Sequence, residues 1–291
     1  MKFIERSQFF QTEVPIGSPY GMRKGYPYRF VPQTSYSVEN IDRGRAAPDF
    51  PLRSRFFYAH DPDGRSPIAL TEPAPDLTAE GLACRRGERL VFTGVSFRLP
   101  AGGALLLTGA NGSGKTSLLR LLATLIEPAA GRLVWGTSPV AADIAGYRAG
   151  LHYVGHQDGV KPGLTPRETL AFWMALRGLD ASRAEPVLDA ALRTFALDTV
   201  ADWPCRWLSA GQRRRLALAR LVSAPALIWL LDEPTSALDH DNQTRLERAI
   251  AAHRDAGGRV VVASHTPIDV GPAGVVTLDA FAPLSDHATA G

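Results

Sequence analysis

The segment from Gly109 to Thr116 reads GANGSGKT and matches the phosphate-binding pattern G-x-x-x-x-G-K-[ST]. Its glycines let successive backbone N–H groups turn toward an anion, and the helix that follows adds a positive dipole end. Lys115, expected as a solvent-facing ligand, should reach the β- and γ-phosphates, and the Thr116 hydroxyl should bind Mg²⁺. The predicted contacts of a nucleoside triphosphate are Gly109, Ala110, Asn111, Gly112, Ser113, Gly114, Lys115, Thr116 and Ser117.

Two carboxylates and a histidine follow apolar runs further along the chain. Residues 226–231 read ALIWLL, which is typical of a central parallel strand buried on both faces, and Asp232 and Glu233 come directly after it. We expect Asp232 to hold Mg²⁺, directly or through water, and Glu233 to act as general base or to orient a water. His265 follows another apolar run, 259–263. A single histidine is more often structural, but its place after this strand favours sensing of the γ-phosphate.

Gln157 also follows a short predicted strand, residues 151–154. An open α/β sheet places its ligand contacts at the carboxyl ends of its strands, so Gln157 is expected near the metal or the attacking water. A single glutamine is usually structural, and this prediction depends on the neighbouring motifs. The predicted Mg²⁺ ligands are Thr116, Gln157 and Asp232.

Regular elements must hold these side chains in place. A buried strand, 104–107, and a leucine-rich helix, 117–125, flank the phosphate loop. A hairpin is expected before them, with strands 77–83 and 90–99 joined through residues 85–88, and a further strand at 131–135. Thr165, Pro166 and Glu168 form a capping box that starts a helix over 166–177, and a second helix is expected between 182 and 195. These two helices predict an inserted helical lobe.

Residues 208–212, LSAGQ, precede one more predicted helix. Ser209 and Gln212 have capping-box spacing, so the N–H groups of this helix start should face outward and attract phosphate. Arg213, Arg214 and Arg215 are interpreted as its charged outer face, without a catalytic role. Arg85 and Arg86 are likewise interpreted as solvated surface rather than as a stacking platform for adenine.

Composition limits the function classes. The apolar fraction of 45% is ordinary for a globular protein, and the net charge of +3 gives no indication of nucleic-acid binding. Cys84 and Cys205 lie far apart without metal-type spacing, which favours a reducing compartment. No apolar run is long enough to span a membrane, and the start does not resemble a signal peptide. We therefore expect a cytosolic protein whose membrane role, if it has one, comes through a partner.

Residues 1–76 have a different composition, with ten prolines and many aromatic side chains. Prolines this frequent exclude long helices and central strands. Three interpretations remain open: an extended arm that packs on a partner or on the catalytic domain, a small appended module, or a misassigned start codon. A chain starting near Pro75 is expected to fold and work without this extension. The expected domain covers 77–283, and 284–291 are expected to form a flexible tail.

The phosphate loop, LSAGQ (208–212), LLDEP (230–234), SALD (236–239) and His265, in this order, resemble the nucleotide-binding domain of ABC ATPases. The resemblance implies an α/β P-loop NTPase with a mostly parallel core sheet, an N-terminal antiparallel β subdomain and an inserted helical subdomain. It implies ATP and Mg²⁺ as cofactors. Glu233 would be the catalytic carboxylate, Gln157 the Q-loop residue and His265 the switch histidine. Ser209 and Gly211 would contact the nucleotide of a second copy in a head-to-tail homodimer, and Gln212 and Asp239 are included among the nucleotide-binding residues.

The sequence VGHQDGVK (154–161), with Leu164, Thr165 and Glu168, and the run LSAGQRRRLALAR (208–220) resemble the CcmA family of cytochrome c biogenesis ATP-binding export proteins. That resemblance implies a peripheral ATPase on the cytoplasmic face of the bacterial inner membrane, with CcmB-like and CcmC-like membrane-spanning permease subunits. The ATPase would power haem export or release of the holo-haem chaperone in c-type cytochrome maturation. The N-terminal 76 residues have no recognised counterpart in this family.

Other functions remain as alternatives. The chain could serve another ABC exporter, for a drug, a lipid or an ion, and residues 155–168, expected to face the membrane partner, would discriminate. A soluble ABC protein of DNA repair or translation would need a long coiled-coil insertion or a second ATPase domain, for which the chain has no room. A non-enzymatic binding module would not need both Glu233 and His265.

Overall fold

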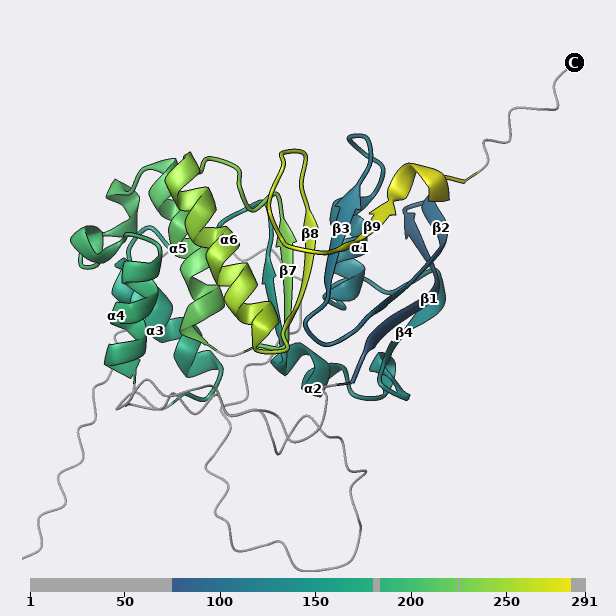
Figure 1. The fold of residues 1–291 in the computed structure, drawn as a ribbon, viewed down its shortest axis with the longest axis horizontal. Coiled ribbons are helices and arrows are strands. Elements are labelled where there is room, and N and C mark those ends of the chain that lie inside the picture. Colours follow the sequence, from purple (N-terminus) through teal and green to yellow (C-terminus); the bar gives the residue numbers. More distant parts are fainter. Residues whose placement is uncertain (1–74, 180–183, 225, 284–291) are drawn as a thin grey trace, which may run out of the picture. The chain divides into compact units, whose positions relative to one another are not determined.

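The computed structural model describes residues 75–179, 184–224 and 226–283. The predicted extension 1–76, except for its last two residues, and the predicted tail 284–291 therefore lie outside the described residues. Figure 1 shows the arrangement of the helices and strands in the described part.

A parallel five-stranded sheet forms the centre of the fold (Figure 1). Its strands run in the order β6-β7-β8-β3-β9, and every neighbouring pair is parallel. The strands are β3 (Ala104–Thr108), β6 (Leu151–Val154), β7 (Ile228–Asp232), β8 (Arg259–Ala263) and β9 (Gly274–Thr277). Every residue of β7 and β8 is buried, as a strand with two covered faces requires. The predicted parallel core is confirmed, and β9 is an addition that the sequence analysis missed.

The register of this sheet brings the carboxyl ends of four strands to one edge. Asp232 at the end of β7 pairs with Ala263 of β8, and Leu107 of β3 pairs with the same Ala263. Val154 at the end of β6 lies beside Leu231. The segments that leave these strands are therefore neighbours in space, although they are far apart in the sequence.

A second, antiparallel sheet has the order β2-β1-β4-β5 and confirms the predicted N-terminal β subdomain. Its strands are β1 (Leu77–Arg86), β2 (Arg89–Leu99), β4 (Ala130–Trp135) and β5 (Ser138–Pro139). The hairpin strands are longer than expected, and the turn between them is limited to Gly87 and Glu88, where the φ of Gly87 is 59°. Glycine adopts that backbone conformation without steric cost.

Helices cover both faces of the parallel sheet. The described helices are α1 (Lys115–Leu122), α2 (Ile144–Ala149), α3 (Pro166–Leu176), α4 (Ala184–Thr194), α5 (Ala210–Ser223) and α6 (His240–Asp255). Of these, α1, α2, α5 and α6 contact the strands of the sheet directly. Alternate residues of β7 belong to two separate cores, as the two-residue period of a strand requires. Trp229 and Leu231 pack with α3 to α6, whereas Ile228 and Leu230 pack with α1 and the antiparallel sheet.

The inserted helical lobe is present as α3 and α4, which pack with each other and with α5 (Figure 1). The capping box predicted at its start is formed, because the Thr165 hydroxyl accepts from the Glu168 N–H and the Glu168 carboxylate accepts from the Thr165 N–H. Short 3₁₀ turns over Asp198–Val200 and Cys205–Trp207 then lead to α5.

The predicted extent of the helix after the phosphate loop is wrong at its end. The helix α1 stops at Leu122, Thr124 has a φ of 54°, and Leu125 is 55% exposed instead of packing on the sheet. A left-handed residue turns the chain away from the helix axis, so the leucine stripe ends one turn earlier than its spacing indicated. The short helix α2 and the 3₁₀ turn before it, Val140–Ala142, were not predicted.

Candidate functional site

The predicted phosphate loop connects β3 to α1. Its last glycine, Gly114, has a φ of 108°. A Cβ at this position would lie 2.7 Å from Val91 Cγ1 and 2.9 Å from Phe92 Cδ1. Any side chain would therefore strain the backbone and collide with β2, which fixes the loop against the antiparallel sheet.

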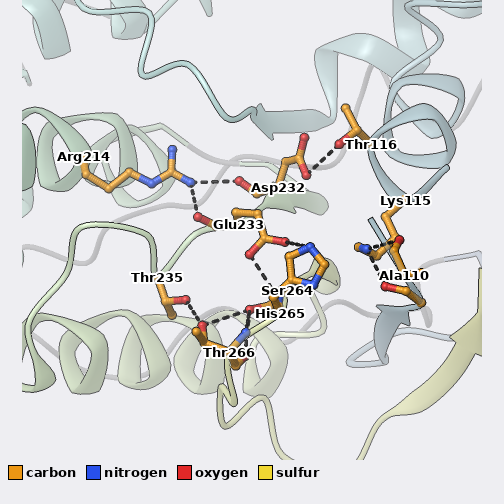
Figure 2. A network of polar contacts seen from close by, with 11 residues as sticks. Ala110, Lys115, Thr116, Arg214, Asp232, Glu233, Thr235, Ser264, His265 and Thr266 are labelled. Atoms are coloured by element: carbon orange, nitrogen blue, oxygen red, sulfur yellow. Dashed lines mark hydrogen bonds and ion pairs between the residues drawn. The ribbon is translucent and has the colours of Figure 1, made fainter. Parts of the chain in front are cut away.

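Lys115 lies at the first position of α1 and is only 7% exposed, so the prediction that it faces solvent is wrong. Its Nζ donates hydrogen bonds to Gly109 O at 2.7 Å and to Ala110 O at 3.0 Å (Figure 2). The loop thus curves around the ammonium group, which supplies a fixed positive charge at its centre. Asn111 and Gly112, at the tip of the loop, are exposed.

Two serines of the loop differ in their surroundings. The Ser113 hydroxyl is buried and has no hydrogen-bond partner among the described residues. Buried polar atoms are normally paired, so an unpaired hydroxyl inside this loop fits a site for phosphate oxygens. Ser117 is buried behind the loop and its hydroxyl interacts with the Cys84 thiol. A nucleotide contact of Ser117 would therefore come from its backbone.

Asp279 also belongs to the loop environment, and the sequence analysis did not identify it. It lies in a 3₁₀ turn, Leu278–Phe281, directly after β9. Its Oδ2 accepts a hydrogen bond from the Ala110 N–H at 3.0 Å. Just before the loop, the hydroxyls of Thr108 and Thr277 lie 3.0 Å apart. The unpredicted strand β9 therefore secures the start of the phosphate loop.

Asp232 and Thr116 form the candidate cation site. The Thr116 hydroxyl donates to Asp232 Oδ1 at 3.2 Å (Figure 2). Asp232 is 3% exposed, and its Oδ2 is buried without a hydrogen-bond partner among the described residues. An unpaired buried carboxylate oxygen beside a hydroxyl is a donor set that suits Mg²⁺, which prefers oxygen ligands. These residues fit the metal that the sequence predicts.

Gln157, the third predicted cation ligand, is not part of this pair. It is exposed, and its side chain makes no hydrogen bond to any described residue. The loop that carries it follows β6 and reaches the same edge of the sheet as Asp232. A role for Gln157 at the metal or at the attacking water stays a prediction.

Glu233 and His265 meet at the ends of β7 and β8 (Figure 2). Glu233 Oε1 lies 3.4 Å from His265 Nε2, and Glu233 Oε2 accepts from the His265 N–H at 3.1 Å. The structure thus brings together the two residues predicted as general base and phosphate sensor. The His265 side chain is 48% exposed, so it can approach a bound ligand from this position.

The backbone of Glu233 is unusual, with a φ of 49°. A residue with a side chain in the left-handed region costs of order 1–3 kcal/mol and persists where its surroundings enforce it. Here the Glu233 N–H donates to Ala263 O at 2.8 Å, and the Glu233 carbonyl accepts from Arg214 Nη2 at 2.7 Å. Both peptide groups of the residue are therefore fixed.

The prediction that Arg213 to Arg215 form a charged outer face is wrong. Arg214 is 2% exposed and donates to backbone carbonyls around Glu233 (Figure 2). Arg213 donates to Leu208 O at 2.5 Å, and Arg215 donates to two carbonyls at the end of the helical lobe, Phe195 O and Ala196 O. All three guanidinium groups donate to backbone carbonyls at the ends of helices and strands near α5, where the regular hydrogen-bond ladders stop.

The start of α5 has the predicted capping box. Ser209 Oγ accepts from the Gln212 N–H at 3.1 Å, and Gln212 Oε1 accepts from the Ser209 N–H at 2.8 Å. Ser209 is exposed. A Cβ at position 211 would lie 2.9 Å from Ala237 O, which is too close for a side chain, so this position favours glycine. Contact of Ser209, Gly211 and Gln212 with the nucleotide of a second copy stays a prediction.

Asp239 caps α6. Its Oδ1 accepts from the Asn242 N–H at 2.8 Å and from the Asn242 side chain at 2.7 Å, and these bonds, the backbone one foremost, lower its pKa. It is therefore an exposed, ionised carboxylate, and its predicted nucleotide contact is untested. Arg85 and Arg86 are exposed as expected, whereas Cys84 is buried in the core.

Comparisons with known proteins agree with this geometry. Residues 92–236 match the ABC transporter family. The cytochrome c biogenesis ATP-binding export protein CcmA of Rhodospirillum rubrum is 56% identical over 211 residues, which cover 72% of this chain and 89% of that protein. The protein of the same name from Rhizobium meliloti is 44% identical over 203 residues, which cover 70% and 96% of the two chains.

Solved structures support the same fold. An ABC transporter ATP-binding protein from Pyrococcus furiosus has a TM-score of 0.63 and 21% identity, and the match covers 71% of this chain and 99% of that one. The ATP-binding subunit of another ABC transporter has a TM-score of 0.60 and 23% identity, with 65% and 79% covered. Among the described residues, no helix combines the length and apolarity that crossing a membrane requires. The chain belongs to the ATP-binding proteins of ABC transporters and, within them, to the CcmA family of cytochrome c biogenesis ATP-binding export proteins.

Proposed function

We propose that this chain is the ATP-hydrolysing subunit of an ABC transport complex that acts in c-type cytochrome maturation. The observation that carries the proposal is the Glu233–His265 pair, which lies beside the Asp232–Thr116 pair and the phosphate loop. A phosphate cradle, a candidate cation site and an oriented carboxylate at one sheet edge are the parts that ATP hydrolysis requires.

Each group has a distinct task in that reaction. Lys115 neutralises charge on the β- and γ-phosphates, and the loop N–H groups and the Ser113 hydroxyl bind their oxygens. Thr116 and Asp232 would hold Mg²⁺, which when bound neutralises charge on the same phosphate oxygens. Glu233 orients a water and accepts its proton, while His265 holds the carboxylate in place and reaches toward the γ-phosphate.

We further propose that two copies work head to tail. The exposed N-terminus of α5 carries Ser209 and Gly211, and Asp239 is exposed nearby at the start of α6. Helix N-termini attract phosphate, so this face suits the triphosphate bound to the phosphate loop of a second copy. A homodimer of this kind would place two ATP molecules between its subunits.

The 56% identity to CcmA of Rhodospirillum rubrum supports the cellular assignment. The proposed partners are CcmB-like and CcmC-like permease subunits, and the proposed place is the cytoplasmic face of the bacterial inner membrane, peripherally bound. The complex would serve haem export or release of the holo-haem chaperone. No residue in the site described above is specific for haem, so the substrate would be recognised by the membrane partners.

Deletion of the gene in its own host tests this assignment. We expect covalent c-type cytochromes to disappear from haem-stained gels of membranes, while b-type haem proteins persist. The wild-type gene should restore the c-type bands, and a gene carrying Glu233→Gln should not. Unchanged c-type bands after deletion would overturn the cytochrome assignment and would favour another ABC exporter, without affecting the proposed ATPase activity.

A further inference from the structure

Arg214 connects three parts of the chain at the catalytic edge of the sheet. It lies in the first turns of α5 and is 2% exposed. Its guanidinium donates to the carbonyls of Asp232 at 2.9 Å, Glu233 at 2.7 Å and Pro234 at 3.2 Å. It also donates to Gly155 O at 2.9 Å and forms an ion pair with Asp158 Oδ1 at 3.1 Å. Figure 2 shows it directed at the carbonyl side of Asp232 and Glu233.

These contacts bear on the one catalytic carboxylate whose backbone is strained. Glu233 has a φ of 49°, and this conformation decides where its side chain points. The Arg214 hydrogen bonds to Asp232 O and Glu233 O fix the peptide groups on either side of the Glu233 Cα. Without them each peptide group keeps one backbone bond, from the Glu233 N–H to Ala263 O at 2.8 Å and from the Ser236 N–H to Glu233 O at 3.2 Å. Loss of the Arg214 bonds would therefore loosen the orientation of the Glu233 carboxylate relative to His265 without unfolding this turn.

The same guanidinium also donates hydrogen bonds to the loop that carries Gln157. Gly155 and Asp158 lie on either side of Gln157, and both are bonded to Arg214 Nη1. The planar guanidinium is rigid and presents its donors in a fixed fork, so the positions of this loop and of Glu233 are linked through one side chain. Lysine, with a single ammonium group, cannot reproduce five directed bonds to these segments.

We propose that Arg214 is a positioning residue for ATP hydrolysis, which holds the Glu233 carboxylate in its working orientation and links that orientation to the 155–158 loop. This inference rests on the proposed ATPase activity. It assigns to Arg214 no contact with the nucleotide. ATP binding should therefore survive its replacement, whereas the rate of the chemical step should not.

The test compares Arg214→Lys with Arg215→Lys in the full chain. Arg215 is a matched control, because it lies on the same helix and also donates to two backbone carbonyls, Phe195 O and Ala196 O. Among the described residues it shares none of the hydrogen-bond partners of Arg214. We expect Arg214→Lys to lower kcat by about tenfold to a hundredfold, since small displacements of a catalytic group have effects of this size. The dissociation constant of Arg214→Lys for ATP should stay within about threefold of wild type. Both kcat and the dissociation constant for ATP of Arg215→Lys should also stay within about threefold of wild type.

A second variant, Asp158→Asn, keeps Arg214 and its carbonyl contacts but removes the ion pair. We expect a smaller loss of kcat, with ATP affinity unchanged, and this variant decides the matter if Arg214→Lys does not fold. The inference is overturned if folded Arg214→Lys keeps the wild-type kcat, or if it loses ATP affinity instead of kcat. If Arg214→Lys does not fold, an unchanged kcat of Asp158→Asn overturns it. A wild-type chain without ATPase activity would instead overturn the proposed function, and the inference with it.

Discussion

We expect the stability of this protein to depend on pH, because two of its histidines are buried. His152 of β6 is 2% exposed, its Nε2 lies 3.0 Å from Ala224 O, and its Nδ1 lies 3.2 Å from Arg177 Nη2. Because the guanidinium can only donate, Nδ1 must accept, and the ring must be neutral. Burial, followed by the Arg177 charge, lowers the pKa of His152 to about 3.

His253 of α6 is the second such residue. It is 7% exposed, and its ring stacks on Trp229 with the ring centres 3.9 Å apart and an interplanar angle of 5°. Its Nε2 lies 3.2 Å from Arg259 O. Burial lowers the pKa of His253 to about 4.

The direction of the effect follows from proton linkage. In the unfolded chain both histidines titrate near the ordinary value of about 6.5, so between that value and the folded pKa the unfolded state binds more protons. The contribution of the two neutral histidines to the free energy of unfolding is therefore fully present above about pH 6.5 and is lost as the pH falls toward their folded pKa values. From pH 7 to pH 5 each histidine contributes a loss of about 2 kcal/mol, and the two together about 4 kcal/mol. For a domain of this size we expect the melting temperature to fall by about 8 to 16 °C.

Thermal or urea unfolding of the full chain at pH 7 and pH 5 measures this loss. The control is a chain with both His152→Gln and His253→Gln, in which the amide introduced at position 152 can still donate to Ala224 O and accept from Arg177. It should start less stable, since the stacking on Trp229 is lost, but its stability should change little between the two pH values. Asp239, whose pKa is lowered, loses its contribution only at more acidic pH. Equal wild-type stability at pH 7 and pH 5, or an equally steep fall in the control, would refute this reasoning.

Two further changes have expected outcomes of their own. Lys115→Ala should weaken ATP binding by at least about tenfold, since a charge-assisted hydrogen bond is worth about 1.5–3 kcal/mol. Titration with a fluorescent ATP analogue measures the affinity, and replacement of the exposed Lys161 by alanine is the control. Equal affinity of Lys115→Ala and wild type would count against the phosphate site. A chain that begins at Leu77 should melt about 5 °C below the full chain, because the Pro75 carbonyl accepts from the buried Arg259 guanidinium. A chain that begins at Thr71 should match the full chain in melting and in ATP hydrolysis, and identical melting of both shortened chains would show that this contact contributes little.

The parts of the site that neighbouring residues determine could be predicted from the sequence. The phosphate loop, the capping boxes at Thr165 and Ser209, and the carboxylates after β7 depend on residues within a few positions of one another. The meeting of Glu233 and His265 was also predictable, because parallel strands end at a common edge.

The parts that depend on distant segments could not be predicted in this way. Arginines are usually solvated, and the burial of Arg214 results from carbonyls of two loops that only the folded sheet brings together. Asp279 reaches the phosphate loop through β9, a four-residue strand whose position beside β3 no local pattern indicates. The burial of Lys115 depends on the curvature of the loop around it, since its partners are two backbone carbonyls.

ATP hydrolysis by the purified full chain and by its Glu233→Gln variant tests the central claim most directly. Glutamine keeps the shape of the side chain but cannot accept the proton of water, so turnover should fall by about 10² to 10⁴. ATP binding should be retained, and the variant should accumulate as an ATP-bound dimer on a sizing column. Hydrolysis by Glu233→Gln at the wild-type rate would show that Glu233 is not the base and would contradict the assignment of this site.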